Sequence, residues 1–238
     1  MKRAERRHLK QNELQRWAIQ ARGALEERKR ETTIGVVAVL VVAAAIAGWS
    51  GWRGYVESRA QRDLAEALAV QEARVTAAGT PATPGSFPSD RARQQAAVTK
   101  FKAAADAHPT TDAGIFARYQ EAAGQVALGN PTGAAAAYQD VISRSGKGIM
   151  AQMARLGLAD AQARAGQYDQ AINTFKELAQ HKDGPLPVDG ILMQLGRTYR
   201  DAGKPADAQQ TFNRLVQEYP DSPFTSEARR ELDALKTT

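Results

Sequence analysis

The side chains that usually perform acid–base or metal chemistry are few in this sequence and stand far apart. The three histidines are His8, His108 and His181, and none is followed four residues later by a second histidine, as in a helical zinc site. Glu227 and Glu231 have the spacing of an exposed helix surface. The chain has no cysteine, no glycine-rich phosphate loop and no nucleophile elbow. We therefore expect no catalytic residue, no metal site and no cofactor, and we predict that the protein is not an enzyme.

A second group of side chains has the chemistry of binding rather than of reaction. Methionines and aromatic residues adapt to varied apolar segments, and arginines can hold a carboxylate through paired hydrogen bonds. The sequence predicts a stack of helical hairpins, as argued below, and such residues occupy the first helix of each hairpin. In a stack of this kind the first helices line the concave face. The candidates for a peptide groove are Phe116, Tyr119, Met153, Leu156, Asp160, Met193, Arg197 and Arg200. In the alternative interpretation, the apolar members pack hairpin against hairpin and the arginines face water.

The helices that would position these residues repeat with a period of 37 residues. Each repeat has a small residue, an aromatic residue four positions later and, in most repeats, a larger apolar residue three positions further on. The small residues are Ala97, Ala134, Ala171 and Ala208. The aromatic residues are Phe101, Tyr138, Phe175 and Phe212, and the last positions are Ala104, Val141, Leu178 and Leu215. Residues with this spacing share one helix face, so the pattern predicts buried helices.

The turns between the predicted helices keep the same phase. Gly129, Gly166 and Gly203 stand 37 residues apart, where a helix would end and glycine can adopt the left-handed conformation. Asn130 can cap the next helix, and a proline in the first helical turn, such as Pro131, suits that position. The unit is a helix, a tight turn and a helix. The sequence therefore predicts an all-α fold built as a superhelix of helical hairpins.

These positions resemble the tetratricopeptide repeat family, whose hairpins are about 34 residues long. The last complete unit matches the family signature in order, through Leu195, Gly196, Tyr199, Gly203, Ala208, Phe212 and Pro220. The preceding unit has Gln162 where the family has an aromatic residue, and the first unit lacks the family's leucine and aromatic residue in its first helix. The resemblance covers about residues 91–238. It implies a protein-binding fold without naming the ligand.

A membrane span precedes the repeats. Residues 32–52 include no charged side chain, and as a helix these 21 residues are about 31 Å long, enough for a hydrocarbon core of about 30 Å. Residues 1–31 carry 10 Lys or Arg and 5 Glu, so the basic residues that stay in the cytoplasm lie before the span. This predicts a cytoplasmic N-terminus and an external C-terminal domain. The alternative is a signal peptide cleaved after Ala45-Ile46-Ala47.

The sequence thus divides into four predicted segments. They are a basic amphipathic segment (1–31), a transmembrane helix (32–52), a membrane-proximal helix with a proline-rich linker (53–90) and the repeat domain (91–238). The linker could be flexible or could form a packed elbow that folds the membrane-proximal helix onto the repeats. Because the basic charge is concentrated before the span, we expect contact with membrane lipid there and no binding of nucleic acid. The alternative for this segment is a solvated leader that only sets the topology.

This topology resembles that of the YfgM-like family, ancillary subunits of the SecYEG translocon in the bacterial inner membrane. The resemblance implies a periplasmic repeat domain that assists newly translocated proteins, with a translocon or its exported clients as partners. The end of the chain, through Tyr219, Pro220, Asp221 and Ser222, is also similar to the last repeats of envelope-assembly proteins. We therefore predict a membrane-anchored module that binds proteins in a chaperone-like role. A self-assembling homo-oligomeric scaffold without clients is the alternative.

Overall fold

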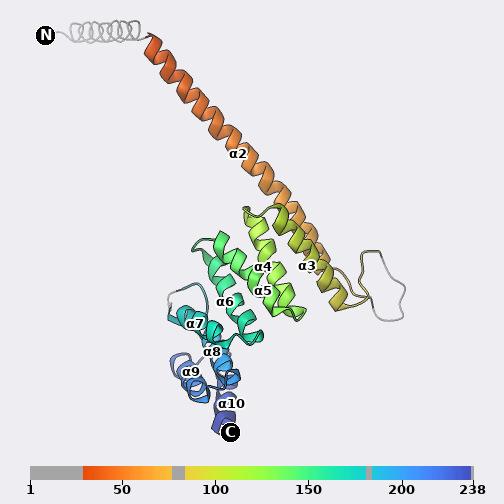
Figure 1. Ribbon diagram of the computed structural model, residues 1–238, viewed down its shortest axis with the longest axis vertical. Helices are drawn as coiled ribbons and strands as arrows, with labels where there is room; N and C mark the ends of the chain where they lie inside the picture. Colours follow the sequence, from red (N-terminus) through yellow and green to blue (C-terminus); the bar gives the residue numbers. More distant parts are fainter. Residues whose placement is uncertain (1–28, 77–83, 181–183, 237–238) are drawn as a thin grey trace, which may run out of the picture. The chain divides into compact units, whose positions relative to one another are not determined.

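The computed structural model describes residues 29–76, 84–180 and 184–236 (Figure 1). Within these ranges the secondary structure is helical, apart from one isolated bridge between Val75 and Phe87. The helices are α2 (Lys29–Gln71), α3 (Asp90–Ala107), α4 (Asp112–Ala127), α5 (Pro131–Arg144), α6 (Ile149–Arg164), α7 (Tyr168–Gln180), α8 (Val188–Asp201), α9 (Pro205–Glu218) and α10 (Thr225–Lys236). The predicted all-α fold is confirmed. The predicted amphipathic segment, residues 1–31, lies almost wholly outside the described residues.

The chain forms two compact units, residues 1–55 and 56–238. In the first unit, the described residues belong to α2, whose large apolar side chains are exposed, as for Val39 at 68%. An exposed apolar helix of this kind suits lipid better than water. Trp49 and Trp52 stand near the end of the predicted span with ring centroids 5.5 Å apart, and aromatic residues concentrate at such membrane boundaries. By length and composition, α2 qualifies as a helix that could cross a membrane.

The second unit is a row of antiparallel hairpins that stack in chain order. The hairpins are α4 with α5, α6 with α7 and α8 with α9, while α3 precedes them and α10 follows (Figure 1). The first helices of successive hairpins also touch, α4 against α6 and α6 against α8. This arrangement places α4, α6 and α8 side by side, which is the order that a groove along the first helices requires.

The repeated positions of the sequence form the interior of these hairpins, as predicted. The four alanines, four aromatic residues and four following residues of the 37-residue pattern are all buried, with no side chain more than 7% exposed. Two of the aromatic rings, those of Tyr138 and Phe212, pack against glycines on a neighbouring helix. A Cβ atom at Gly157 would lie 2.4 Å from the ring of Tyr138, and one at Gly196 would lie 2.4 Å from the ring of Phe212. Each glycine therefore allows a close approach that alanine would obstruct.

The predicted glycine turns are also confirmed. Gly129, Gly166 and Gly203 have φ angles of 81°, 76° and 70°, in the region that favours glycine. After Gly129, the amide of Asn130 donates to the carbonyl of Gln125 at 2.8 Å, which closes the helix end in a Schellman motif. The Asn130 side chain then accepts from the amide of Gly133 at 3.1 Å and caps α5. Asn130 thus closes the end of α4 with its backbone and caps the start of α5 with its side chain, which accounts for the tightness of the turn.

The described part of the second unit begins before the predicted repeat boundary at residue 91. Residues 56–71 of α2 pack on α3, with Ala67 fully buried in a cluster that includes Phe101. The Asp63 carboxylate lies 2.8 Å from Nε2 of His108, and two backbone hydrogen bonds join residues 74 and 76 to Phe87. Residues 56–71 are therefore packed on the repeats, whereas part of the predicted proline-rich linker lies outside the described residues. This helical segment occupies the place of a first helix, paired with α3.

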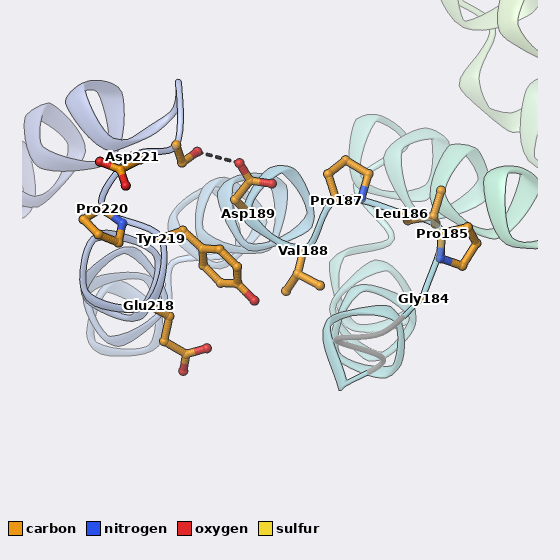
Figure 2. A pocket seen from close by; sticks show the side chains of 11 residues that line it. Gly184, Pro185, Leu186, Pro187, Val188, Asp189, Glu218, Tyr219, Pro220 and Asp221 are labelled. Carbon is orange, nitrogen blue, oxygen red and sulfur yellow. Dashed lines mark hydrogen bonds between the residues drawn. The ribbon is translucent and has the colours of Figure 1, made fainter.

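The turn between α9 and α10 is tied to the start of α8. The Ser222 hydroxyl donates to the Asp189 carboxylate at 2.6 Å (Figure 2), and the Phe224 amide donates to the Ser222 oxygen at 3.1 Å. The Thr225 hydroxyl donates to the carbonyl of Tyr219 at 2.9 Å. The Ser222 bond attaches the turn to the start of α8, and the Thr225 bond attaches the first residue of α10 to the end of α9. Together they hold α10 against the last hairpin.

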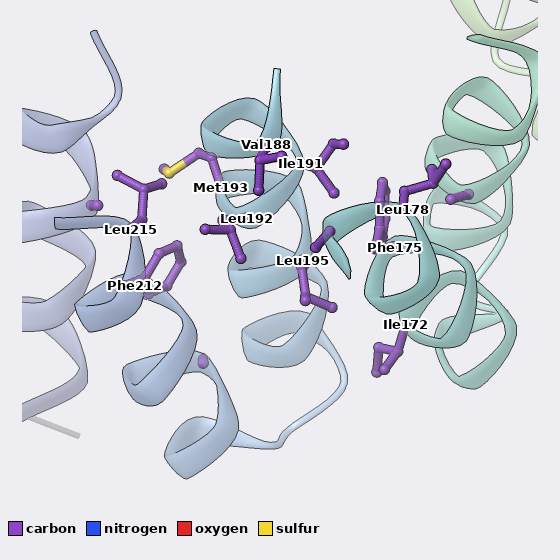
Figure 3. Close-up of a cluster of buried hydrophobic side chains, with 14 of the residues drawn as sticks. Ile172, Phe175, Leu178, Val188, Ile191, Leu192, Met193, Leu195, Phe212 and Leu215 are labelled. Carbon is purple, nitrogen blue, oxygen red and sulfur yellow. The ribbon is translucent and has the colours of Figure 1, made fainter. Parts of the chain in front are cut away.

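The largest apolar cluster surrounds α8 (Figure 3). Ile191, Leu192 and Leu195 of α8 meet Phe175 from α7 and Phe212 from α9, and each of the five is at most 4% exposed. The clusters nearer the start of the hairpin row contain mostly alanine with one buried aromatic residue each. The last hairpin is consequently the most strongly apolar part of the array.

Candidate protein-binding surface

Four of the predicted groove residues stand on the neighbouring helices α4 and α6. Phe116 and Tyr119 lie on α4, Met153 and Leu156 lie on α6, and all four are half-buried. The rings of Phe116 and Tyr119 stack with their centroids 6.5 Å apart and an angle of 18° between their planes. Stacked rings and a methionine form an apolar surface that a partner's side chains can cover.

Tyr138 supports this surface from α5. Its ring meets Tyr119 edge-on, with centroids 5.5 Å apart and planes at 66°. Burial raises the pKa of the Tyr138 hydroxyl far above its ordinary value, and electrostatic interactions with the Tyr119 hydroxyl and the Asp160 carboxylate add to the effect. The Tyr138 ring therefore remains neutral and enclosed, and it fixes the position of Tyr119.

Ile149 extends the surface, although the sequence analysis did not select it. It is the first residue of α6, is 57% exposed and precedes Met153 by four positions. Among the described residues of the second unit, Val75 is the other large apolar side chain that is exposed, at 36%. The i, i+4, i+7 spacing of Ile149, Met153 and Leu156 was the available signal. We define the α4–α6 surface as Phe116, Tyr119, Ile149 and Met153 on these neighbouring helices, whereas Leu156 packs against the apolar cluster around α8.

Asp160 lies on the same stripe of α6 but is paired. Its carboxylate accepts from Nε of Arg164 at 2.8 Å, one helical turn away. Such an exposed pair adds little stability, but it cancels the charge locally. Apolar contact therefore dominates the α4–α6 surface.

Met193 does not belong to an open groove. The sequence analysis placed it beside the other candidates, but its side chain is 1% exposed and lies close to Leu215 of α9 (Figure 3). The prediction for this residue is corrected, because α9 and α10 cover α8 and enclose its apolar face. The alternative interpretation, packing of hairpin against hairpin, describes Met193.

Arg197 and Arg200 also differ from the expected carboxylate clamp. Arg197 donates to Glu227, and Nη1 of Arg200 donates to both carboxylate oxygens of Glu231 at 2.5 and 2.6 Å. The hydrogen bonds to Glu231 raise the pKa of Arg200 above its ordinary value. Both acceptors lie on α10, so these arginines join α8 to α10 and are not free to bind a partner's carboxylate.

A second ionic cluster joins α3, α4 and α5, and the sequence analysis missed it. Arg118 donates to Asp106, contacts Glu121 at 2.6 Å and contacts Asp140 at 3.1 Å. Glu121 is only 3% exposed. Hydrogen bonds from Lys102 and then from Arg118 hold the pKa of Asp106 below its ordinary value. The three carboxylates come from three helices, so this cluster locks the helices together rather than forming a reactive site.

The part of the chain that the structure describes contains no cluster of metal-ligand side chains. No group of three or more His, Cys, Asp or Glu side chains is arranged there to hold an ion. The contacts described above are consistent with binding by shape and apolar area.

A family model described as a tetratricopeptide repeat-like domain matches residues 29–236. No curated protein matches the sequence significantly. Two solved structures of TPR-like repeats, described as a Podosopora anserina kinesin light chain, have a TM-score of 0.58 and 14% identity, and they cover 76% of this chain and 86% or 87% of theirs. A tetratricopeptide repeat protein from Parabacteroides merdae has a TM-score of 0.49 and 18% identity, over 62% of this chain and 56% of that one. At such identities the likeness concerns the fold alone.

Proposed function

We infer the function from the fact that the chain belongs to the tetratricopeptide repeat-like domain family, and we propose that it is a membrane-anchored module that binds segments of other proteins. Folds of this family usually serve as scaffolds for protein interaction, and the repeats here carry no constellation of catalytic groups among the described residues. The anchor would be α2 and the binding element would be the stack of hairpins. The protein would act by holding its partners rather than by changing them chemically.

The α4–α6 surface is the observation that carries this proposal. It combines stacked aromatic rings with an exposed isoleucine and a methionine, and its charged neighbour Asp160 is neutralised by Arg164. An apolar segment of a partner protein gains most from such a surface, because it removes apolar area from water on both sides. The pairing of Arg197 and Arg200 with α10 leaves the surface without a carboxylate clamp, so recognition would depend on apolar side chains.

The anchor would make weak binding sufficient. A surface tethered to a membrane meets other membrane-bound or emerging chains at high effective concentration, so each contact can remain weak and reversible. This property suits a protein that handles many clients in succession.

We further propose that the repeats lie in the bacterial periplasm and assist secretion or envelope assembly. The support is the basic N-terminal segment before a single apolar helix, which favours a cytoplasmic N-terminus. The same arrangement resembles the YfgM-like ancillary subunits of the SecYEG translocon. A translocon, or the proteins it exports, would be the partners.

Crosslinking in intact cells tests the proposal. A photoreactive residue at Met153 or Ile149 should capture other proteins, whereas one at Gln210, exposed on α9, should capture few. Identification of the captured proteins would show whether a translocon or its clients are among them. Equal capture at all three positions would contradict the assignment of the α4–α6 surface. Capture of further copies of the chain alone would instead support the scaffold alternative.

A further inference from the structure

A hollow of about 650 Å³ lies between the loop that leads into α8 and the turn that joins α9 to α10. Its walls include Pro185, Pro187, Val188, Asp189, Tyr219 and Asp221. The side chains of Tyr219 and Val188 approach one another across it (Figure 2). Its volume lies within the range of about 300–1,000 Å³ that small-molecule sites occupy, so it can admit a large side chain and the backbone beside it.

The walls of the hollow present apolar and polar surface in about equal measure, and the apolar part includes side chains that pack on the core. Val188 is 5% exposed, Tyr219 is half-buried, and both pack against the large cluster around α8. Pro185, Pro187 and Pro220 add further apolar area, and prolines have no backbone N–H to offer to an anion. The hollow therefore provides an aromatic face, and the prolines in its walls offer no backbone N–H group.

Among the residues that the structure describes, the charged side chains lining the hollow are all acidic. Asp189, Glu218 and Asp221 line it, and no lining residue in the described part of the chain is lysine or arginine. Asp189 is held in place because one of its carboxylate oxygens accepts the Ser222 hydroxyl at 2.6 Å. A fixed carboxylate beside an aromatic face has the complementary chemistry for a cation with a long apolar stem.

We propose that this hollow binds an arginine side chain carried by an extended segment of a partner protein. The planar guanidinium group can stack on the Tyr219 ring while its N–H groups donate to the carboxylates of Asp189 and Asp221. Arginine fits better than lysine, because the ammonium group is more strongly hydrated and does not stack. The hollow lies at the ends of α8 and α9, so the inference concerns a second site and stands independently of the α4–α6 surface.

The test uses the full-length protein in detergent micelles, labelled with ¹⁵N, and the small probe L-arginine amide. L-citrulline amide is the matched control probe, because it keeps the shape of arginine but carries no charge on its side chain. Arginine amide should shift the amide resonances of Val188, Asp189, Tyr219, Asp221 and Ser222 in a saturable manner. Citrulline amide should leave these resonances nearly unchanged. Equal shifts with both probes, or shifts spread over the whole chain, would overturn the proposal.

Substitutions then identify the groups responsible. The double variant Asp189→Asn with Asp221→Asn should bind arginine amide roughly fivefold to tenfold more weakly, as expected for loss of two partly exposed ion pairs. Asparagine at position 189 can still accept from Ser222, so the turn should stay folded. Glu177→Gln, on the exposed face of α7, is the control and should bind as the wild type does. Unchanged binding in the double variant would overturn the proposal. Shifts of the same resonances with protein concentration alone would assign the hollow to a second copy of the chain and would also overturn it.

Discussion

Replacing Gly157 with alanine tests how the α4–α6 surface is supported. A Cβ atom at this position would stand 2.4 Å from Cζ of Tyr138, closer than side-chain atoms approach one another in folded proteins. Tyr138 is only 4% exposed, and its ring meets Tyr119 with centroids 5.5 Å apart. The enclosed ring has to move, and we expect the displacement to reach Tyr119 at the surface.

The change in the free energy of unfolding caused by Gly157→Ala has two opposing contributions. Overpacking of a close-packed interior costs about 1–3 kcal/mol, whereas alanine is better than glycine in a helix by up to about 1 kcal/mol. Gly190→Ala is the matched control, because its Cβ atom would meet Phe224 at an ordinary 3.5 Å. The Gly190→Ala protein should therefore gain stability from the helix preference of alanine without the steric cost. The free energies of unfolding of the two variants should differ by about 1–3 kcal/mol, which corresponds to roughly 2–12 °C in melting temperature.

Thermal unfolding of the full-length protein in micelles, followed by far-ultraviolet circular dichroism, measures this difference. The Gly157→Ala protein should melt below the Gly190→Ala protein, and its crosslinking from Met153 in cells should decrease. Crosslinking in the Gly190→Ala protein should match that of the wild type. If Gly157→Ala melted as high as the control and crosslinked normally, the support of Tyr119 by Tyr138 would be refuted.

Three further predictions concern the remaining contacts. Arg200→Ala should destabilise α10 by at most about 1 kcal/mol and speed amide hydrogen exchange there up to about fivefold, because the partly exposed ion pair that joins α8 to Glu231 of α10 is lost. Equal acceleration along the whole chain would contradict the assigned pairing. Ala67→Glu should lower the unfolding free energy by more than about 2 kcal/mol, because it places a carboxylate in a fully buried position. Ala65→Glu, on the exposed face of the same helix, should have no such effect. Thermal melts of the two variants distinguish a packed first helix from a linker. Asp106 has a pKa below its ordinary value of about 3.9, so it contributes stability above that pH that is lost as the pH falls through the lowered pKa. Asp106→Asn should consequently lose less stability than the wild type on acidification, as measured by melts over an acidic pH series, and parallel losses would contradict the role of this carboxylate.

The two ends of the hairpin row have different means of stabilisation. Around α8, large aliphatic and aromatic side chains fill the interior, whereas α3, α4 and α5 combine alanine-rich packing with the ionic cluster around Arg118. Alanine buries little apolar area, so helices packed through alanine gain less from the hydrophobic effect. The hydrogen-bonded pairs between these helices set their register instead.

The repeat itself could be predicted from the sequence because its physical causes are local. A small residue, an aromatic residue and an apolar residue at i, i+4 and i+7 must share a helix face, and Gly129 can take a positive φ angle whatever surrounds it. The same is true of the apolar, uncharged composition of residues 32–52, which depends on no neighbour. The helical hairpins, their turns and the candidate span therefore follow from short stretches of sequence.

Tertiary structure decided which faces of those helices remain open. Met193 and Leu156 occupy corresponding places in the pattern, 37 residues apart, yet Met193 is enclosed between α8 and its neighbours while Leu156 stays half-exposed. Arg200 finds its partner Glu231 on a helix 31 residues further along the chain. Periodicity places a side chain on a face of its own helix, but exposure and charge pairing depend on which distant helix packs against that face, and that is determined only when the hairpins assemble.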